Sequence, residues 1–244
     1  MTNAPSIRLF VDDALEAEAA VQLERGQSHY LVNVMRRGVG TRVLLFNGRD
    51  GEWLGEIAAA DKKSAVVSVT SRTRPQHAEP DVWLLFAPLK KDRTDFLVEK
   101  ATELGASRLI PVTTQHGQTA RLNTDRLRAT ATEAAEQSRR LTVPEIAEPA
   151  SLEKTLGDWP DDRKLIFLDE TGDGEPLAAA LDEGQEPLAF LIGPEGGFAP
   201  GELDGLRKLT FSVAADLGPR ILRAETAAAA ALAIRQSVAD LKQN

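Results

Sequence analysis

The chain has 244 residues, with 29 Lys+Arg against 37 Asp+Glu, so its formal net charge is −8. This length allows one large domain or a small one beside a medium one, and 42% hydrophobic with 27% charged residues excludes a disordered chain. There is no cysteine, which excludes disulfides, thiolate metal sites and cysteine nucleophiles. The sequence has no run of about 18 apolar residues and no basic-then-apolar N-terminal signal, so we expect a cytoplasmic protein without a membrane span.

The first 73 residues are predicted to form a small barrel or barrel-like sheet. Short strand patterns alternate with turn residues, and Asn47-Gly48 is a strong hairpin signal. The predicted elements are strands at 7–11, 41–46, 52–60 and 65–71 and a helical turn at 29–36. Residues 74–80 (RPQHAEP) contain two prolines and a polar middle, and they are the predicted linker.

From residue 81 the pattern changes to alternating strands and helices. The apolar run VWLLFA at 82–87 is typical of a strand that is buried on both faces. The predicted elements are strands at 82–87, 109–112, 164–168, 188–192 and 210–213 and helices at 92–104, 123–139, 200–208 and 225–241. This alternation predicts an α/β domain with a mostly parallel sheet.

Charge is unevenly distributed along the chain. Residues 1–140 hold 20 Lys+Arg and 18 Asp+Glu, whereas residues 141–244 hold 9 and 19. Because phosphate binding relies on clustered cations, a polyanion would have to bind the first part or local basic patches. Pairs such as Arg36-Arg37 and Arg139-Arg140 are candidates, although similar pairs are common on surfaces that bind nothing.

A glycine-rich segment, LIGPEGGF at 191–198, follows one of the buried strands. Its glycines allow backbone conformations closed to other residues and let a ligand approach the main chain. In open α/β sheets, ligands bind beyond the carboxyl ends of the strands, where this segment lies. It lacks the Lys-Ser/Thr pair of a P-loop and the Gly-x-Gly-x-x-Gly spacing of a dinucleotide site. A turn without a ligand is the alternative interpretation.

A second segment, LGPRILRAET at 217–226, gathers two arginines, a carboxylate and a hydroxyl at a strand-to-helix corner. Arg220 and Arg223 are candidate site residues because arginine binds planar or anionic groups through a fixed fork. A structural ion pair with Glu225 would explain them as well. The three histidines are scattered without ligand spacing, so no metal site is predicted.

These two segments resemble the paired C-terminal motifs of the RsmE family of ribosomal RNA small subunit (uracil-N3) methyltransferases, in the SPOUT superfamily. Three further stretches agree in order and spacing: residues 29–40 (HYLVNVMRRGVG), 93–111 (RTDFLVEKATELGASRLIP) and 134–146 (AAEQSRRLTVPEI). The resemblance therefore covers nearly the whole chain. It implies S-adenosylmethionine as the cofactor, N3 of a specific uridine in 16S ribosomal RNA of the small ribosomal subunit as the methyl acceptor, and a homodimer.

The resemblance also implies an α/β fold with a SPOUT-type parallel sheet and a C-terminal trefoil knot over residues 81–244. A small PUA-like β-barrel that helps hold RNA would occupy residues 1–73. Carried over residue by residue, the cofactor-binding positions are Leu168, Asp169, Glu170, Gly193, Pro194, Glu195, Gly196, Gly197, Leu217, Gly218, Ile221 and Leu222. The predicted RNA-binding positions are Arg8, His29, Arg36, Arg37, Arg93, Arg139, Arg140 and Arg220.

Two stretches depart from the family's pattern. Ala224 stands where the family usually has threonine, so a hydroxyl role at that position is lost or was never needed. Residues 114–117 read TQHG where the family has Ser-Glu-Arg-Ser, which leaves His116 or Arg121 to substitute for the arginine.

The predicted chemistry is proton removal followed by methyl transfer. Methylation at a pyrimidine C5 generally needs a cysteine, which this chain lacks, so attack by a nitrogen or oxygen is left. As the N3 proton leaves, charge builds on O2 and O4 of the uracil; we predict that Arg223 stabilises it. Glu225 or Glu195 would orient the base or accept the proton. Two alternatives stay open: a SPOUT ribose 2′-O-methyltransferase acting on ribosomal or transfer RNA, and a non-catalytic RNA-binding protein of ribosome assembly.

Overall fold

A computed structural model describes residues 7–61, 63–117, 122–181 and 187–243, and the chain divides into two compact units. Unit 1 comprises Met1–Ala78 together with Ala135–Val143, and unit 2 comprises Glu79–Ala134 together with Pro144–Asn244. The first division therefore falls within the predicted linker. The second shows that a short segment beyond residue 134 belongs to unit 1, although its sequence continues the C-terminal domain.

Unit 1 is built on a five-stranded sheet in the order β1-β3-β4-β5-β2. Its elements are β1 (Arg8–Phe10), β2 (Ala20–Gln22), α1 (Arg25–His29), the π-helical turn η1 (Tyr30–Val34), β3 (Arg42–Phe46), β4 (Glu52–Ala60) and β5 (Ala65–Arg74). β1 pairs parallel with β3, and the other pairs are antiparallel. Register shifts interrupt the pairing of β4 with β5 at three places, and such bulges bend a strand and increase its twist.

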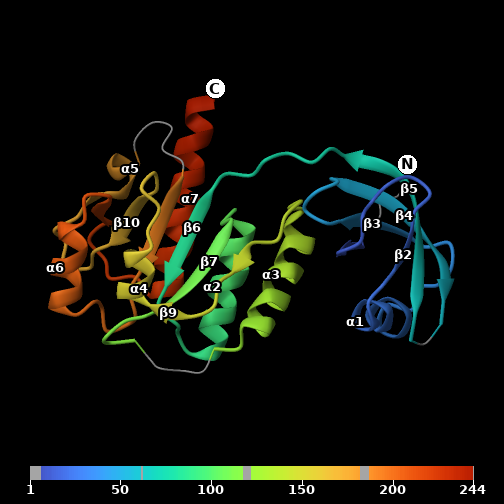
Figure 1. Ribbon diagram of the computed structural model, residues 1–244, viewed down its shortest axis with the longest axis horizontal. Helices are drawn as coiled ribbons and strands as arrows, with labels where there is room; N and C mark the ends of the chain where they lie inside the picture. The colour runs from blue at the N-terminus through green and yellow to red at the C-terminus, as the bar shows by residue number, and fades with distance from the viewer. Residues whose placement is uncertain (1–6, 62, 118–121, 182–186, 244) are drawn as a thin grey trace. The chain divides into compact units, whose positions relative to one another are not determined.

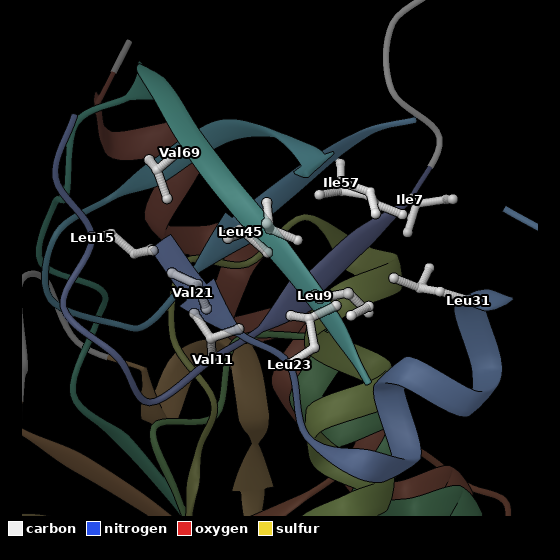
Figure 2. Packing of buried hydrophobic residues seen from close by; sticks show 13 residues of the cluster. Ile7, Leu9, Val11, Leu15, Val21, Leu23, Leu31, Leu45, Ile57 and Val69 are labelled. Atoms are coloured by element: carbon white, nitrogen blue, oxygen red, sulfur yellow. The ribbon is translucent and has the colours of Figure 1, made fainter. Parts of the chain in front are cut away.

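The core of unit 1 follows from the alternation of its strands. In β5, Ala65, Val67 and Val69 are buried whereas the residues between them are half-buried, because successive side chains point to opposite faces. These side chains pack with Leu45 of β3 and Leu31 of η1 in one apolar cluster, seen from close by in Figure 2. The predicted helical turn at 29–36 is thus part of the core as well as of the surface.

The β3–β4 connection is a five-residue loop rather than a two-residue hairpin. Asn47 is buried, and its side-chain oxygen accepts hydrogen bonds from the backbone N–H groups of Arg49 (3.0 Å) and Asp50 (2.9 Å). Gly48 and Gly51 both take positive φ. The Asn-Gly pair does mark the reversal, but the asparagine side chain organises a wider loop.

Unit 2 contains an all-parallel sheet in the order β11-β13-β10-β12-β6-β7-β8, with β9 paired to β7 (Figure 1). Its strands are β6 (Val82–Phe86), β7 (Arg108–Thr113), β8 (Glu145–Ile146), β9 (Ala150–Ser151), β10 (Lys164–Leu168), β11 (Glu175–Pro176), β12 (Leu188–Ile192) and β13 (Ser212–Asp216). Its helices are α2 (Lys91–Glu103), α3 (Thr124–Ser138), α4 (Leu152–Gly157), α5 (Leu177–Ala180), α6 (Pro200–Lys208) and α7 (Ala224–Gln243). The last turn of α3 belongs to unit 1.

Helices cover the unit 2 sheet. α4 and α6 pack on strand residues such as Leu85, Phe167 and Leu191, in one cluster. α2 and α7 contact each other, and α7 also contacts β12. Every residue of β12 is buried, as expected for a central strand of a parallel sheet.

The predicted long strands and helices of unit 2 are confirmed with small shifts at their ends. β13 begins two residues later than predicted, and the short elements β8, β9, β11, α4 and α5 were not predicted. The neighbours β13, β10 and β12 end on the same side of the sheet, so the segments after them gather at one edge. The trefoil knot stays a prediction of the resemblance.

Candidate active site

Three loops at the carboxyl edge of the unit 2 sheet enclose one cavity of about 720 Å³. They follow β10, β12 and β13, and the last leads into α7. This volume lies within the range of roughly 300–1,000 Å³ that small-molecule sites occupy. The glycine-rich segment at 191–198 and the arginine-containing segment at 217–226 therefore meet at a single site.

Most of the predicted cofactor-binding residues line this cavity. They are Leu168, Asp169, Glu170, Gly193, Pro194, Glu195, Gly197, Leu217, Gly218, Ile221 and Leu222. Gly196 is not among the lining residues; its carbonyl lies 3.2 Å from Nδ1 of His116. His116, in the stretch that departs from the family's pattern, thus touches the glycine-rich loop. The other substitute, Arg121, lies outside the described residues.

Two glycines in the loop after β12 stand at crowded positions, and one of them has a positive φ. Gly197 has φ +67°, and a Cβ there would lie 1.5 Å from Oε1 of Glu170. A Cβ on Gly193 would lie 3.0 Å from the ring of Phe198, which is buried in the sheet core. Both positions keep the backbone close to its neighbours, which explains glycine at these places without reference to a ligand.

Asp169 holds the loop after β10 in place, through partners that the sequence did not indicate. Its buried carboxylate accepts hydrogen bonds from the Thr171 backbone (2.9 Å) and hydroxyl (2.7 Å), and from Arg207 of α6 (2.7 Å). Burial alone would raise the pKa of Asp169, but these hydrogen bonds and the Arg207 charge outweigh it and hold the pKa below its usual value. Asp169 therefore stays ionised at neutral pH and stabilises the wall of the cavity.

Two arginines, Arg220 and Arg223, lie at the rim of the cavity. Arg220 and Arg223 line the cavity and are exposed, and neither guanidinium has a hydrogen-bond or ion-pair partner among the described residues. The alternative interpretation, a structural ion pair of either with Glu225, is therefore not what these residues form. The backbone carbonyl of Arg223 accepts a hydrogen bond from Ala227, which places this arginine at the start of α7.

The acidic residues of the site pair with Arg93 of α2 instead. Nη1 of Arg93 donates to Oε1 of Glu195 at 2.6 Å, and its Nε lies 3.8 Å from Oε1 of Glu225. Glu225 is buried at the first turn of α7, and its Oε2 has no hydrogen-bond partner in the part of the chain that the structure describes. Glu225 does not line the cavity itself, but its neighbours Arg223 and Ala224 do.

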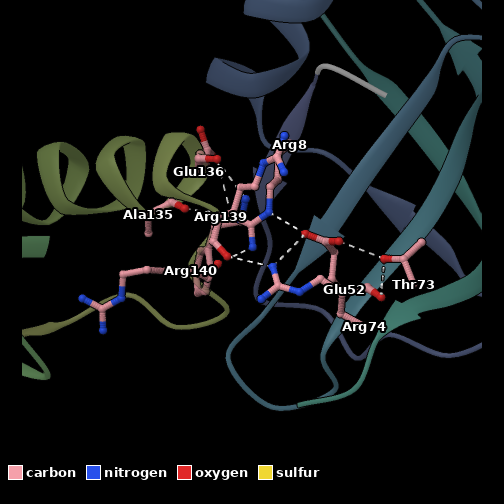
Figure 3. Close-up of polar contacts among 9 residues, drawn as sticks. Arg8, Glu52, Thr73, Arg74, Ala135, Glu136, Arg139 and Arg140 are labelled. Carbon is pink, nitrogen blue, oxygen red and sulfur yellow. Dashed lines mark hydrogen bonds and ion pairs between the residues drawn. The ribbon is translucent and has the colours of Figure 1, made fainter. Parts of the chain in front are cut away.

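The structure separates the predicted RNA-binding residues into exposed and buried ones. His29, Arg36, Arg37, Arg139 and Arg220 are exposed, and Arg93 is half-buried. Arg8 and Arg140 are buried within unit 1. As Figure 3 shows, Arg8 lies against Glu52 and the backbone of the segment 135–140, so its guanidinium has partners inside the protein. Their burial makes Arg8 and Arg140 less available to RNA than the exposed cations, and a role for them in RNA binding stays a prediction.

Two absences apply to the part of the chain that the structure describes. No cluster of three or more His, Asp or Glu side chains suitable for a metal ion occurs there. None of the helices in that part combines the length and the apolar character needed to cross a membrane.

Comparison with known proteins shows similarity to RNA methyltransferases along nearly the full chain. An RNA methyltransferase domain model matches residues 77–236, and an RNA methyltransferase PUA domain model matches residues 23–70. A ribosomal RNA small subunit methyltransferase E from Rickettsia conorii is 30% identical over 93% of this chain and 93% of its own. One from Bacillus subtilis is 31% identical over 82% of each chain.

Among solved structures, a ribosomal RNA small subunit methyltransferase E from Neisseria gonorrhoeae bound to S-adenosyl methionine is similar with a TM-score of 0.87 and 25% identity. It covers 95% of this chain and 97% of its own. The PUA match lies in unit 1, and the methyltransferase match covers most of unit 2 together with residues 135–143 of unit 1. The predicted parallel α/β fold with a PUA-like N-terminal part is confirmed. The chain belongs to the ribosomal RNA small subunit methyltransferase E family.

Proposed function

We propose that this protein transfers a methyl group from S-adenosylmethionine to N3 of a uridine in 16S ribosomal RNA of the small ribosomal subunit. One observation carries the proposal: the glycine-rich segment at 191–198 and the arginine loop (residues 217–223) line one cavity. The two guanidinium groups at its rim, those of Arg220 and Arg223, have no partner among the described residues. A protein that kept the scaffold only to hold RNA would not need this cavity.

The residues around the cavity fit the cofactor. Its volume of about 720 Å³ lies in the range of small-molecule sites, and Gly193 and Gly197 in its wall carry no side chain that would fill it. The loops at 168–170, 193–197 and 217–222 would hold it. When bound, S-adenosylmethionine supplies an electrophilic methyl group, whose bonding pair stays on sulfur as N3 provides the pair for the new bond.

The protein's own residues would prepare the uracil for attack. Arg223 is free to donate to O2 or O4 of the base, where charge builds as the N3 proton leaves. A carboxylate, Glu225 or Glu195, would take that proton. Positioning these groups around the base supplies much of the rate.

RNA would be held by the exposed cations. We assign this role to His29, Arg36 and Arg37 of unit 1, to Arg139, and to Arg220 at the cavity rim; all five are exposed. We further propose that the protein acts in the cytoplasm. We also propose that it is a homodimer, and light scattering of the purified protein tests this oligomeric state.

The deciding experiment maps the methylated atom. Small subunits from a strain lacking the modification are incubated with the protein and S-adenosylmethionine, and the nucleosides are identified by mass spectrometry at nucleotide resolution. We expect N3-methyluridine at one site. A ribose 2′-O-methylated product, or cofactor binding without any product, would replace the proposal with one of its two alternatives.

Replacing Gly197 with alanine should weaken the binding of S-adenosylmethionine. An L-residue at φ +67° costs roughly 1–2 kcal/mol, and the added Cβ would also displace Glu170. In the variant, the empty loop can relax to a less strained conformation, but it must adopt the wild-type conformation again to bind the cofactor. We therefore expect the affinity for S-adenosylmethionine to fall by about 5- to 30-fold, since 1.4 kcal/mol corresponds to a tenfold change in affinity. Titration calorimetry measures this effect.

The matched control is Gly205→Ala in α6, where a Cβ meets nothing within 4 Å. This change should leave cofactor affinity unaltered and stabilise the helix by roughly 0.5–1 kcal/mol. Equal affinities for wild type and Gly197→Ala would show that the conformation of this loop does not matter for binding.

A further inference from the structure

Arg93 joins two carboxylates that come from different parts of the active site. It lies in the first turn of α2, whereas Glu195 lies in the loop after β12 and Glu225 in the first turn of α7. One guanidinium therefore ties the glycine-rich loop to the helix that follows the arginine loop. A cation in the first turn of a helix is unfavourable by itself because of the helix dipole, so both carboxylates compensate for its position.

The two carboxylates are not held equally. Glu195 receives a short, charge-assisted hydrogen bond of 2.6 Å from Nη1. Glu225 has only the longer contact of 3.8 Å, which involves Oε1. Its second oxygen, Oε2, is buried and accepts no hydrogen bond from any described residue, and Glu225 as a whole is only 9% exposed. A buried carboxylate oxygen without a donor is costly, and a ligand N–H would satisfy it.

We propose that Arg93 is a positioning residue that selects Glu225 as the proton acceptor. This inference rests on the proposed function. Arg93 engages and neutralises Glu195, which keeps that carboxylate away from the base, and leaves Oε2 of Glu225 as the free acceptor. The N3–H bond of the uracil breaks, its proton forms an O–H bond on Oε2, and the electron pair stays on N3 for the attack. Glu225 does not line the empty cavity but lies beside Arg223 and Ala224, which do, so its side chain must turn toward the base when the RNA binds. Glu225 is then a catalytic residue, and Glu195 holds the loop.

The same contacts argue against Arg93 as a phosphate ligand, which was the expectation from the sequence. An RNA phosphate would have to displace Glu195 from a hydrogen bond of 2.6 Å and leave two carboxylates without their cation. Both would then lie near a polyanion, which is electrostatically unfavourable.

The test compares Glu225→Gln, Glu195→Gln, Arg93→Gln and Arg93→Lys by kcat, by KM for the RNA substrate and by calorimetric affinity for S-adenosylmethionine. We expect Glu225→Gln to lower kcat by about 100-fold, the size of a positioned acid–base group, with cofactor affinity unchanged. Glu195→Gln should lower kcat by less than about fivefold. If the two glutamates exchange these results, the assignment of the acceptor is overturned.

Arg93→Gln should lower kcat by about tenfold at unchanged KM for RNA, and Arg93→Lys should recover most of that loss. The double variant Arg93→Gln/Glu195→Gln should be more active than Arg93→Gln, because it removes the freed carboxylate that competes for the base. A phosphate ligand would behave differently: its loss would raise KM for RNA and reduce the salt dependence of binding by about one charge. That outcome would refute the proposal.

Lys100→Gln is the matched control. Lys100 lies on the same helix, is 29% exposed against 33% for Arg93, and also pairs with two carboxylates, Glu99 and Glu103. It should have wild-type kinetics. Failure of the proposed function and failure of this inference give different results. If the proposed function is wrong, wild type produces no N3-methyluridine. If wild type is active and Arg93→Gln has wild-type kinetics, only the inference about Arg93 is rejected.

Discussion

Arg223→Ala is expected to lower kcat by about 100- to 1,000-fold, the size of the loss when one donor to a developing oxyanion is removed. Arg223 is exposed at the cavity rim and has no partner among the described residues, so its charge is available to a ligand. In the proposed mechanism its role arises only when the uracil loses its proton, and affinity for S-adenosylmethionine should therefore stay within a few-fold of wild type. Single-turnover kinetics and calorimetry measure the two quantities separately.

Arg220→Ala is the informative comparison, because Arg220 lies at the same rim and is equally without a partner. If it contacts the RNA backbone, its loss should raise KM for RNA and leave kcat nearly unchanged. Arg223→Lys should recover only part of the activity, since lysine keeps the charge but not the fork. Equal losses of turnover and cofactor affinity in Arg223→Ala would mean that this arginine binds the cofactor instead.

The sequence predicted the cavity better than it predicted the contacts around it. The segments at 191–198 and 217–226 carry local signals: glycines after a buried strand, and a Gly-Pro bend before an alanine-rich helix. The parallel sheet then brings them to the same edge, so their meeting follows from fold class alone.

The supporting contacts could not be predicted in the same way. Arg207 is 38 residues from Asp169, and Arg93 is 102 residues from Glu195. These two contacts depend on how α6 and α2 pack in the fold, and that packing cannot be predicted from residue types or from their spacing in the sequence. The sequence therefore predicts Arg93 as one of several RNA-binding cations, whereas in the structure its guanidinium pairs with Glu195 and Glu225.

Arg8 is the clearest case of a misread cation. It is 9% exposed, and its Nε donates to Oε2 of Glu52 at 2.7 Å. Nη1 donates to the carbonyl of Ala135 at 2.7 Å, Nη2 to that of Arg140, and the guanidinium lies 3.7 Å from the centre of the Phe46 ring. Burial lowers the pKa of Arg8, while the hydrogen bond and charge of Glu52 oppose that shift. The pair thus joins β1 and β4 to the segment 135–143, through contacts that no local pattern signals.

Glu52→Ala is accordingly expected to destabilise unit 1 by about 3–5 kcal/mol, because it leaves a buried guanidinium without its counter-charge. Glu52 is 5% exposed and also accepts a hydrogen bond from the Thr73 hydroxyl at 2.9 Å. Native-state amide exchange in β3–β5 measures the effect, since it reports on this unit by itself.

Glu56→Ala on the same strand is the matched control, because Glu56 is exposed and its loss should change stability by less than about 0.5 kcal/mol. The folded fraction of Glu52→Ala should still bind RNA with wild-type affinity, since the guanidinium of Arg8 is engaged inside unit 1. If Glu52→Ala proved as stable as Glu56→Ala while RNA affinity changed, Arg8 would face RNA after all. The distinction matters because the sequence alone does not separate a buried arginine from an RNA-binding arginine. Replacing the first lowers stability, whereas replacing the second lowers the affinity for RNA.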